Sequence, residues 1–202
     1  MHFIGNVLSL DLAHTIKCSN FIGDTIDMAG AYQWKGMLLV GHLGKLVKLG
    51  IGIMNTHSRY GDGRMETISA CALQAGADRV LLQAVMGCAT TDEAVRLLKQ
   101  AGLFELVMDL LLERIALSLK RRAPEEMEMG AVIFSNRYGL LGETDNAQEL
   151  IAHVFFILGG ADALGGQHAG IGFGGEAALS VLKDLDLAHG PAQFQRRHAD
   201  AR

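Results

Sequence analysis

The chain lacks the features that mark several classes of protein. No apolar run reaches the roughly eighteen residues that span a bilayer, because the most apolar stretch, residues 103–119, contains four charged side chains. Aromatic residues make up 6% of the chain, which leaves few rings for the stacking of unpaired bases. The formal net charge is −4, whereas nucleic-acid-binding domains are usually basic. We therefore expect a protein that binds neither membranes nor nucleic acid.

Cysteine and proline are also scarce. The three cysteines, Cys18, Cys71 and Cys88, are odd in number and never form a C-x-x-C pair, so the sequence predicts buried reduced thiols, no disulfide framework and no metal site. The first residues lack the basic start and the long apolar centre of a signal peptide, which predicts a cytoplasmic protein. Two prolines against 25 glycines suggest many tight junctions between elements.

Apolar periodicity predicts an α/β fold. Short apolar runs predict strands at residues 14–18, 37–40 and 129–135, with the second strand buried on both faces. Amphipathic patterns predict helices near residues 21–30, 46–53, 63–76 and 103–122, and a capping box at residues 90–93 opens another helix that Gly102 ends. Strand 14–18, the helix after it and strand 37–40 predict a βαβ unit with parallel strands. A turn is predicted at residues 136–139.

The predicted fold is therefore a small, mainly parallel sheet flanked by helices, with a glycine-rich C-terminal appendage. Residues 1–152 are expected to form the α/β domain. Residues 153–202 are predicted to be either a glycine-rich appendage or a poorly ordered tail, because residues 159–175 contain eight glycines and no core-forming pattern follows Leu187.

Positive charge is concentrated between residues 35 and 64. This stretch contains five basic residues and one acidic residue, for a net charge of +4 in a chain of net charge −4: Lys35, Lys45, Lys48, Arg59 and Arg64 against Asp62. Basic residues beside turns at strand ends can focus an anionic ligand. The alternative is a solvated basic surface with no ligand.

Polar residues follow apolar structure at residues 55–59, where Asn55, Thr56, His57, Ser58 and Arg59 are consecutive. Loops of this composition often carry function. His57, like His42 after the predicted strand 37–40, has the chemistry to donate to a ligand or to move a proton. A single histidine is, however, also commonly a surface or structural residue.

Four blocks in this order resemble the cobalt-precorrin-5B C1-methyltransferase family, the CbiD-type enzymes. They are KCSNFIGDTID at 17–27, GMLLVGHLGKLVKL at 36–49, GIMNTHSR at 52–59 and DGRME at 62–66, and IFSNRYGLLG at 133–142 resembles the closing strand of the family. The likeness covers about residues 1–150 and corresponds to the carboxyl-terminal half of the family.

The resemblance implies a methyl transfer from S-adenosylmethionine to carbon 1 of a cobalt-containing tetrapyrrole in anaerobic cobalamin biosynthesis. Cobalt would then arrive inside the substrate. The resemblance also implies that a separate chain could supply the amino-terminal half of the enzyme, and a homo-oligomer is compatible with the sequence. The alternative is a non-catalytic module, derived from that enzyme, that binds a tetrapyrrole or a protein partner.

The candidate site combines this resemblance with the pattern of loops and charges. The expected catalytic residues, which would orient the reactants through their polar side chains, are Asp24, His42 and His57. The residues expected to line the cofactor crevice are Gly41, Gly44, Asn55 and Thr56. The residues expected to pair with substrate carboxylates are Lys45, Lys48, Arg59 and Arg64.

Overall fold

A three-stranded sheet organises the fold. The computed structural model describes residues 16–151. Strand β1 (Gly36–His42) pairs in parallel with β2 (Glu128–Ser135), and β2 pairs antiparallel with β3 (Gly139–Glu143), in the order β1-β2-β3. The parallel pairing runs the whole length of β1, whereas the antiparallel one is shorter. The predicted small, mainly parallel sheet is confirmed, and the glycine-rich appendage lies outside the described residues.

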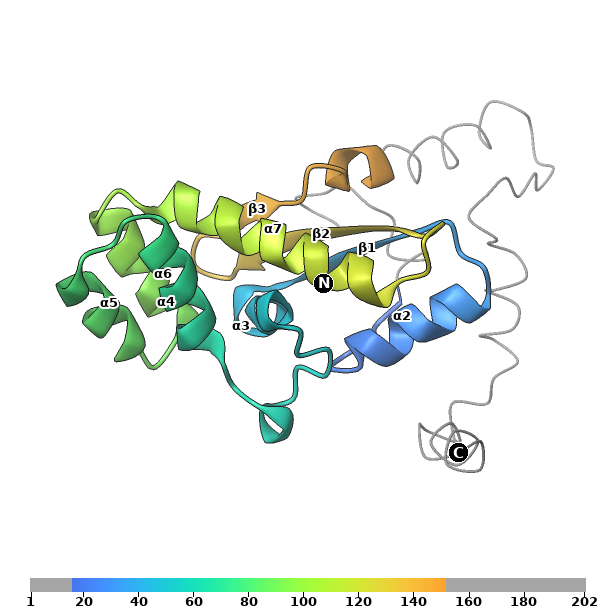
Figure 1. The fold of residues 1–202 in the computed structure, drawn as a ribbon, viewed down its shortest axis with the longest axis horizontal. Helices are drawn as coiled ribbons and strands as arrows, with labels where there is room; N and C mark the ends of the chain where they lie inside the picture. Colours follow the sequence, from blue (N-terminus) through green and yellow to red (C-terminus); the bar gives the residue numbers. More distant parts are fainter. Residues whose placement is uncertain (1–15, 152–202) are drawn as a thin grey trace.

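Helix α7 (Phe104–Arg122) covers the sheet and anchors the core (Figure 1). Its buried residues recur at helical spacing, as predicted for this amphipathic segment: Phe104, Val107, Met108, Leu111, Leu112, Ile115 and Leu119. Lys120, Arg121 and Arg122 occupy its last turn, where positive charge suits the helix dipole. The long helix predicted over residues 103–122 is therefore confirmed.

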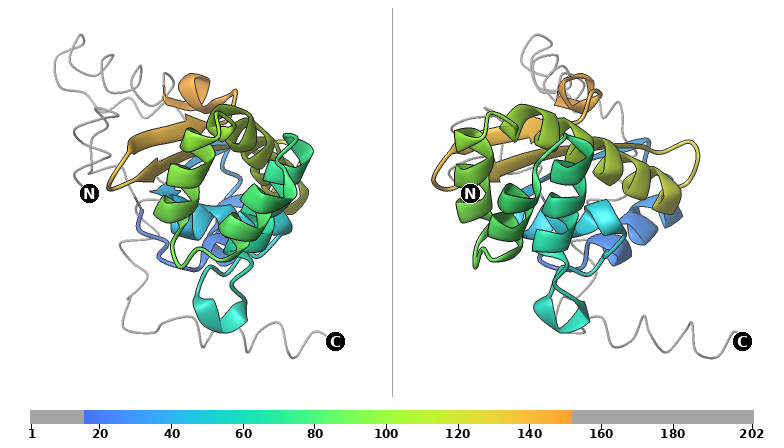
Figure 2. Two further views of the ribbon diagram at one scale, coloured as in Figure 1. Left: turned by 90° about the vertical axis from the view of Figure 1, so that its left-hand side faces the viewer. Right: turned by 60° about the vertical axis from the view of Figure 1, so that its left-hand side comes forward.

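The remaining helices pack around α7 and the ends of the sheet. They are α2 (Ile22–Ala31), α3 (Leu43–Leu46), η2 (Val47–Ile51), η3 (Ser58–Tyr60), α4 (Arg64–Gln74), α5 (Arg79–Met86) and α6 (Thr91–Gln100). The turned views in Figure 2 show the green helices α4–α7 grouped on one side of the sheet. No helix among residues 16–151 is both long enough and apolar enough to cross a membrane.

Helix α6 begins and ends as its sequence predicts. The Thr90 hydroxyl accepts a hydrogen bond from the Glu93 amide at 3.2 Å, and the Glu93 carboxylate accepts one from the Ala89 amide at 3.2 Å. These reciprocal bonds satisfy amides at the helix start. At the other end Gly102 adopts a φ of 67°, which favours glycine and turns the chain out of the helix.

The start of the described chain differs from the prediction. Residues 16–18 form no strand, and the other two residues of the predicted strand 14–18 lie outside the described range. The Phe21 amide instead donates to the Cys18 carbonyl in a turn, and Ser19 has a φ of 52°. Phe21 occupies the N-cap position of α2, and no side chain caps this helix. The predicted βαβ unit is wrong, because the parallel neighbour of β1 is β2.

One further prediction needs correction, and one helix was missed. In β1, Leu39 is buried while Leu38 and Val40, which point to the opposite face, are only half-buried, so the strand is not buried on both faces. Helix α5 was not predicted at all. It has eight residues, of which one, Val85, is buried, and this is too little for a clear amphipathic pattern.

Candidate functional site

The carboxyl end of β1 carries the first of the candidate residues. The Nδ1 atom of His42 accepts a hydrogen bond from the Gly44 amide at 3.1 Å, and His42 thereby caps α3. Its ring packs edge-on against Phe134, with the ring centroids 5.8 Å apart. Because Nδ1 is an acceptor, this hydrogen bond assigns the proton of the neutral ring to Nε2. His42 therefore offers an N–H donor beyond the end of the strand.

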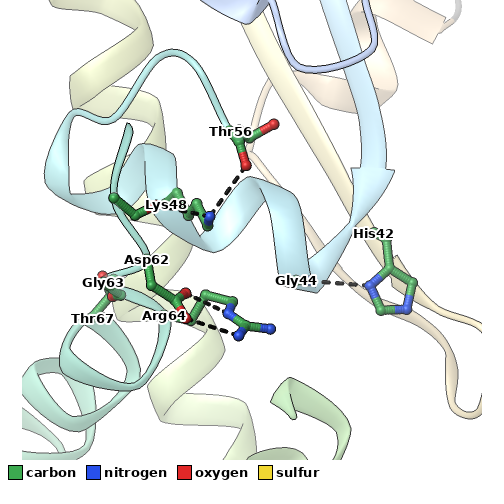
Figure 3. Close-up of polar contacts among 9 residues, drawn as sticks. His42, Gly44, Lys48, Thr56, Asp62, Gly63, Arg64 and Thr67 are labelled. Atoms are coloured by element: carbon green, nitrogen blue, oxygen red, sulfur yellow. Dashed lines mark hydrogen bonds and ion pairs between the residues drawn. The ribbon is translucent and has the colours of Figure 1, made fainter. Parts of the chain in front are cut away.

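Lys48 is buried beneath the loop that follows η2. Its side chain is 4% exposed, and its ammonium group donates to the Thr56 carbonyl at 3.1 Å and to the Gly61 carbonyl at 2.9 Å. Figure 3 shows Lys48 directed toward Thr56, with His42 and Gly44 on a separate part of the site. The Lys48 ammonium thus fixes the shape of the loop at residues 52–63.

The same loop is tied to the start of α2. The Gly23 amide donates to the Met54 carbonyl at 3.0 Å. The Thr56 amide donates to the Asn20 carbonyl at 3.0 Å, and the Thr56 hydroxyl donates to the Asn20 side-chain oxygen at 3.1 Å. An isolated antiparallel β-bridge joins Phe21 to Asn55. Two segments more than thirty residues apart therefore form one unit, and Asn20 is a member that sequence reasoning missed.

Asn55, His57 and Arg59 form a chain of local hydrogen bonds within this loop. The Asn55 side-chain oxygen accepts from the His57 amide at 3.1 Å, and His57 Nδ1 accepts from the Arg59 amide at 3.2 Å. His57 thus caps η3 as His42 caps α3, and it too presents Nε2–H. The His57 and Arg59 side chains are exposed, and the Arg59 guanidinium lies 5.2 Å from the centre of the Tyr60 ring.

The four predicted carboxylate-binding cations differ in their availability. The Lys48 ammonium group already donates to two carbonyls. The Arg64 guanidinium pairs with the Asp62 carboxylate through two hydrogen bonds, one of them 2.9 Å long between Nη2 and Oδ2. Hydrogen bonding to Arg64 lowers the pKa of Asp62. Lys45 and Arg59 are exposed, and neither forms an ion pair with any residue in the described range.

Asp24 lies toward the end of α7. Arg122 bonds to Asp27, with 2.7 Å between Nε and Oδ1, and this hydrogen bonding raises the pKa of Arg122. The Asp24 charge adds to that effect, which places Asp24 in the field of Arg122. Asp27 and Arg122, which sequence reasoning missed, join α2 to α7. The sequence signal for this pair was the two aspartates one helical turn apart on α2, Asp24 and Asp27, which favour a basic side chain beside them.

The two predicted glycines have different surroundings. A Cβ on Gly41 would lie 2.9 Å from Leu46 Cγ, so the missing side chain of Gly41 makes room for the core. A Cβ on Gly44 would lie 3.4 Å from His42 Nδ1 and 3.6 Å from Thr91 Oγ1. The start of α6 therefore lies beside Gly44, just after the end of β1. A hollow of about 170 Å³ lies elsewhere, lined by Lys99, Gly102, Phe104 and Glu105.

The cysteines and acidic residues of the described range do not gather into a metal site. All three cysteines are free, and Cys71 and Cys88 are buried, as predicted, while Cys18 is half-buried. Burial raises the pKa of each thiol, and for Cys18 the nearby Lys45 charge opposes that effect. Within residues 16–151 no group of three or more histidine, cysteine or acidic side chains is placed to hold a metal ion.

These features define a mixed α/β domain with imidazole donors and exposed cations after its first strand. Residues 55–145 match the family model described as CbiD, C-terminal domain. The described domain belongs to the CbiD family, which confirms the resemblance seen in the sequence.

Curated relatives agree with this family. The chain is 40% identical over 152 residues to a cobalt-precorrin-5B C(1)-methyltransferase of Ruminiclostridium cellulolyticum, covering 75% of this chain and 37% of the relative. The proteins of the same name from Fusobacterium nucleatum and Clostridioides difficile are 33% and 34% identical, over 71% and 74% of this chain and 37% of each relative. The chain thus spans about 37% of the length of these relatives. No solved structure matches it.

Proposed function

We propose that this chain provides the C-terminal domain of an S-adenosylmethionine-dependent methyltransferase that acts on carbon 1 of cobalt-precorrin-5B, in the cytoplasm, during anaerobic cobalamin biosynthesis. The observation that carries this proposal is the 40% identity over 152 residues to a relative with that activity in its name. Because the chain spans about 37% of that relative, the proposal assigns the rest of the catalytic unit to polypeptide outside this sequence.

The electrostatics of the site support a polyacidic ligand. In the proposal the exposed cations Lys45 and Arg59 pair with carboxylates of the tetrapyrrole. The Nε2–H groups of His42 and His57 would act as hydrogen-bond donors that orient it. Lys48 and Arg64, whose charged groups already have partners within the protein, would act instead as positioning residues for the loop.

The residues assigned to the cofactor crevice divide in the same way. Gly44 and Asn55 are both half-buried, so part of each residue is accessible to a ligand. Thr56 is 4% exposed and its hydroxyl, amide and carbonyl are all engaged, and Gly41 is packed against Leu46. In this proposal Gly44 and Asn55 would face the cofactor, while Thr56 and Gly41 would shape the crevice.

S-adenosylmethionine would supply an electrophilic methyl group when bound. The contribution of this chain is then to bind and orient, because methyl transfer depends on bringing the methyl group and the ring carbon into line. Asp24, which lies in the first turn of α2 and in the field of Arg122, is assigned to a polar orienting role. No residue of the described domain is required to act as a strong acid or base in this proposal.

Calorimetry of the purified chain tests the proposal. The chain is titrated with S-adenosylmethionine, alone and after saturation with cobyrinic acid, a cobalt corrin with free carboxylate side chains. Saturable heat with both compounds supports the methyltransferase proposal. Heat with the corrin but none with S-adenosylmethionine would favour a non-catalytic binding module. Absence of heat with both would contradict the proposal for this chain.

Charge reversal at the exposed cations should weaken corrin binding. We expect the double variant Lys45→Glu/Arg59→Glu to bind cobyrinic acid about tenfold more weakly at low salt, because attraction becomes repulsion at two exposed positions. The difference should shrink as salt is added, since exposed charges are screened.

The matched control for this prediction is Arg79→Glu. Arg79 is exposed at the start of α5 and outside the candidate site, so its reversal changes the net charge without changing the site. Affinities are measured by titration at several salt concentrations. Equal affinity of the double variant and the unmodified chain at low salt would remove Lys45 and Arg59 from the binding surface.

A further inference from the structure

The turn between β2 and β3 lies at the same edge of the sheet as His42. Strands β1 and β2 are parallel, and His42, the last residue of β1, is the register partner of Phe134 near the end of β2. Figure 1 shows both strands ending on the side of the sheet where α6 lies. Ligands of parallel sheets bind beyond the carboxyl ends of the strands. The residues after β2, none of which is in the candidate set, therefore lie at the edge where a ligand is expected.

Two basic side chains beside this turn contact one aromatic ring. The Lys99 ammonium lies 5.1 Å from the centre of the Tyr138 ring, and the Arg137 Cζ atom lies 5.3 Å from the same centre. Both side chains are exposed, and neither charged group forms a hydrogen bond or an ion pair with any residue among 16–151. Two like charges, which repel each other, are thus held against one ring.

The turn that carries Arg137 and Tyr138 is fixed by a buried hydroxyl. Ser135 is 2% exposed, and its Oγ atom accepts hydrogen bonds from the Arg137 amide at 3.0 Å and from the Tyr138 amide at 3.2 Å. These bonds set the backbone of the turn through main-chain groups alone. The Arg137 guanidinium is therefore not needed to hold the turn, and it stays available to a ligand.

Lys99 also lines the hollow of about 170 Å³, together with Gly102, Phe104 and Glu105, where α6 ends and α7 begins. The Lys99 ammonium lies 4.5 Å from the centre of the Phe104 ring. A Cβ on Gly102 would have no atom within 4 Å, so this side of the hollow is open. Pockets that hold whole small molecules have about 300–1,000 Å³. The hollow therefore fits one substituent of a ligand, next to a positive charge.

Helix α6 sets the distance between this hollow and the candidate site. Its first residue, Thr91, lies beside Gly44, because a Cβ on Gly44 would be 3.6 Å from Thr91 Oγ1. Lys99 follows eight residues later, which is about 12 Å along the helix axis. A ligand that reaches both places must carry anionic groups on different parts of its frame.

We propose that Lys99 and Arg137 form a second carboxylate-binding subsite for the tetrapyrrole, with the hollow receiving one of its acidic side chains. Another acidic side chain would then pair with Lys45 and Arg59. This inference rests on the proposed function. The tetrapyrrole has several carboxylates around its ring, whereas S-adenosylmethionine has one, so the two separate groups of cations suit the tetrapyrrole.

Neutralising both cations tests the subsite. Lys99→Met/Arg137→Gln keeps most of the aliphatic stems that lie on the rings but removes both charges. We expect about tenfold weaker binding of cobyrinic acid at low salt, measured by calorimetric titration, and a smaller difference as salt is added. The control is Lys120→Met/Arg121→Gln, an exposed pair in the last turn of α7, which changes the net charge equally and should leave binding unchanged.

Glu105→Gln should change the affinity in the opposite direction. Glu105 is the acidic residue among the four that line the hollow, and it forms no ion pair with Lys99. Removing its charge while keeping its shape should strengthen binding of cobyrinic acid about twofold, because repulsion of the carboxylate is relieved. If Lys99 only stabilised the fold through the rings, this gain would not occur. Unchanged or weaker binding by Glu105→Gln would contradict a carboxylate in the hollow.

The choice of probe identifies the ligand. Cobinamide, in which amides replace carboxylates, should bind Lys99→Met/Arg137→Gln and the unmodified chain equally. S-adenosylmethionine should also bind both equally. A loss of affinity for S-adenosylmethionine with none for cobyrinic acid would overturn the assignment to the tetrapyrrole.

Failure of this inference and failure of the proposed function give different results. If the unmodified chain binds both compounds and Lys99→Met/Arg137→Gln binds cobyrinic acid as tightly, or no more weakly than the control pair, the subsite is refuted while the proposed function stands. If the unmodified chain binds neither cobyrinic acid nor S-adenosylmethionine, both proposals are contradicted. Urea unfolding at a similar midpoint in all variants shows that the differences in affinity do not come from unfolding.

Discussion

Replacing Lys48 with methionine is expected to lower the free energy of unfolding by about 2–4 kcal/mol. Methionine keeps most of the buried aliphatic stem but removes the ammonium group that donates to the Thr56 and Gly61 carbonyls. Two carbonyls beneath the loop would then lose their partner, and leaving a buried polar group unpaired costs about 1–3 kcal/mol. Urea unfolding followed by circular dichroism measures the change.

The control for this prediction is Lys45→Met, three residues earlier in the chain. Lys45 is exposed, so the same replacement should change the free energy of unfolding by no more than about 0.5 kcal/mol. Amide hydrogen exchange should also show faster exchange in residues 52–63 of Lys48→Met alone. Equal stability of the two variants would mean that the Lys48 ammonium does not hold the loop.

Leu111→Ala is expected to destabilise the chain by about 3–5 kcal/mol. Leu111 is completely buried near the middle of α7, and its Cδ1 atom would lie 3.0 Å from a Cβ on Gly50. The substitution removes apolar contacts and leaves a cavity between α7 and η2, the element that carries Lys48. The free energy of unfolding in urea is again the measurement.

Leu117→Ala supplies a matched comparison on the same helix. Leu117 is 49% exposed, so the same change there should cost less than about 1 kcal/mol, and the high helix propensity of alanine offsets part of that. Because both variants lose the same atoms from the same helix, their difference reports burial. A small effect at both positions would contradict the place of Leu111 in the core.

A helix could be predicted from the sequence when several of its residues carried a recognisable pattern. Helix α7 has seven buried residues at helical spacing, and α6 has a capping box at its start, so both could be located from the sequence. Helix α5 has one buried residue, although Asp78 caps it and Gly87 ends it, and those two residues were the available signal.

Strand pairing was harder to predict because it depends on distant residues. The run at residues 37–40 indicated a strand, but nothing within it specified β2 as its parallel partner. The helix-flanked order of runs favoured a local βαβ unit, and the turn at Cys18–Phe21 replaced its first strand in the described range. The hairpin of β2 and β3 makes the sheet mixed, although the turn between them was predicted.

The sequence predicted where the candidate site lies more accurately than which of its side chains are free to contact a ligand. The sequence located His42 and the loop at residues 55–59, both of which follow apolar structure. It could not distinguish the buried Lys48 from the exposed Lys45, because the difference comes from carbonyls thirteen and eight residues further along the chain. Thr91 was explained as part of a helix start, and only the fold brings it to Gly44.

The separation of β1 from β2 along the chain has a consequence for folding. The whole of residues 43–127 lies between two strands that pair along the full length of β1. A nascent chain leaving the ribosome therefore exposes the apolar segment GMLLVGH long before its partner strand is synthesised. Because such distant pairing raises the contact order, helices α4–α7 can assemble from local contacts first, and closure of the sheet is the slow step.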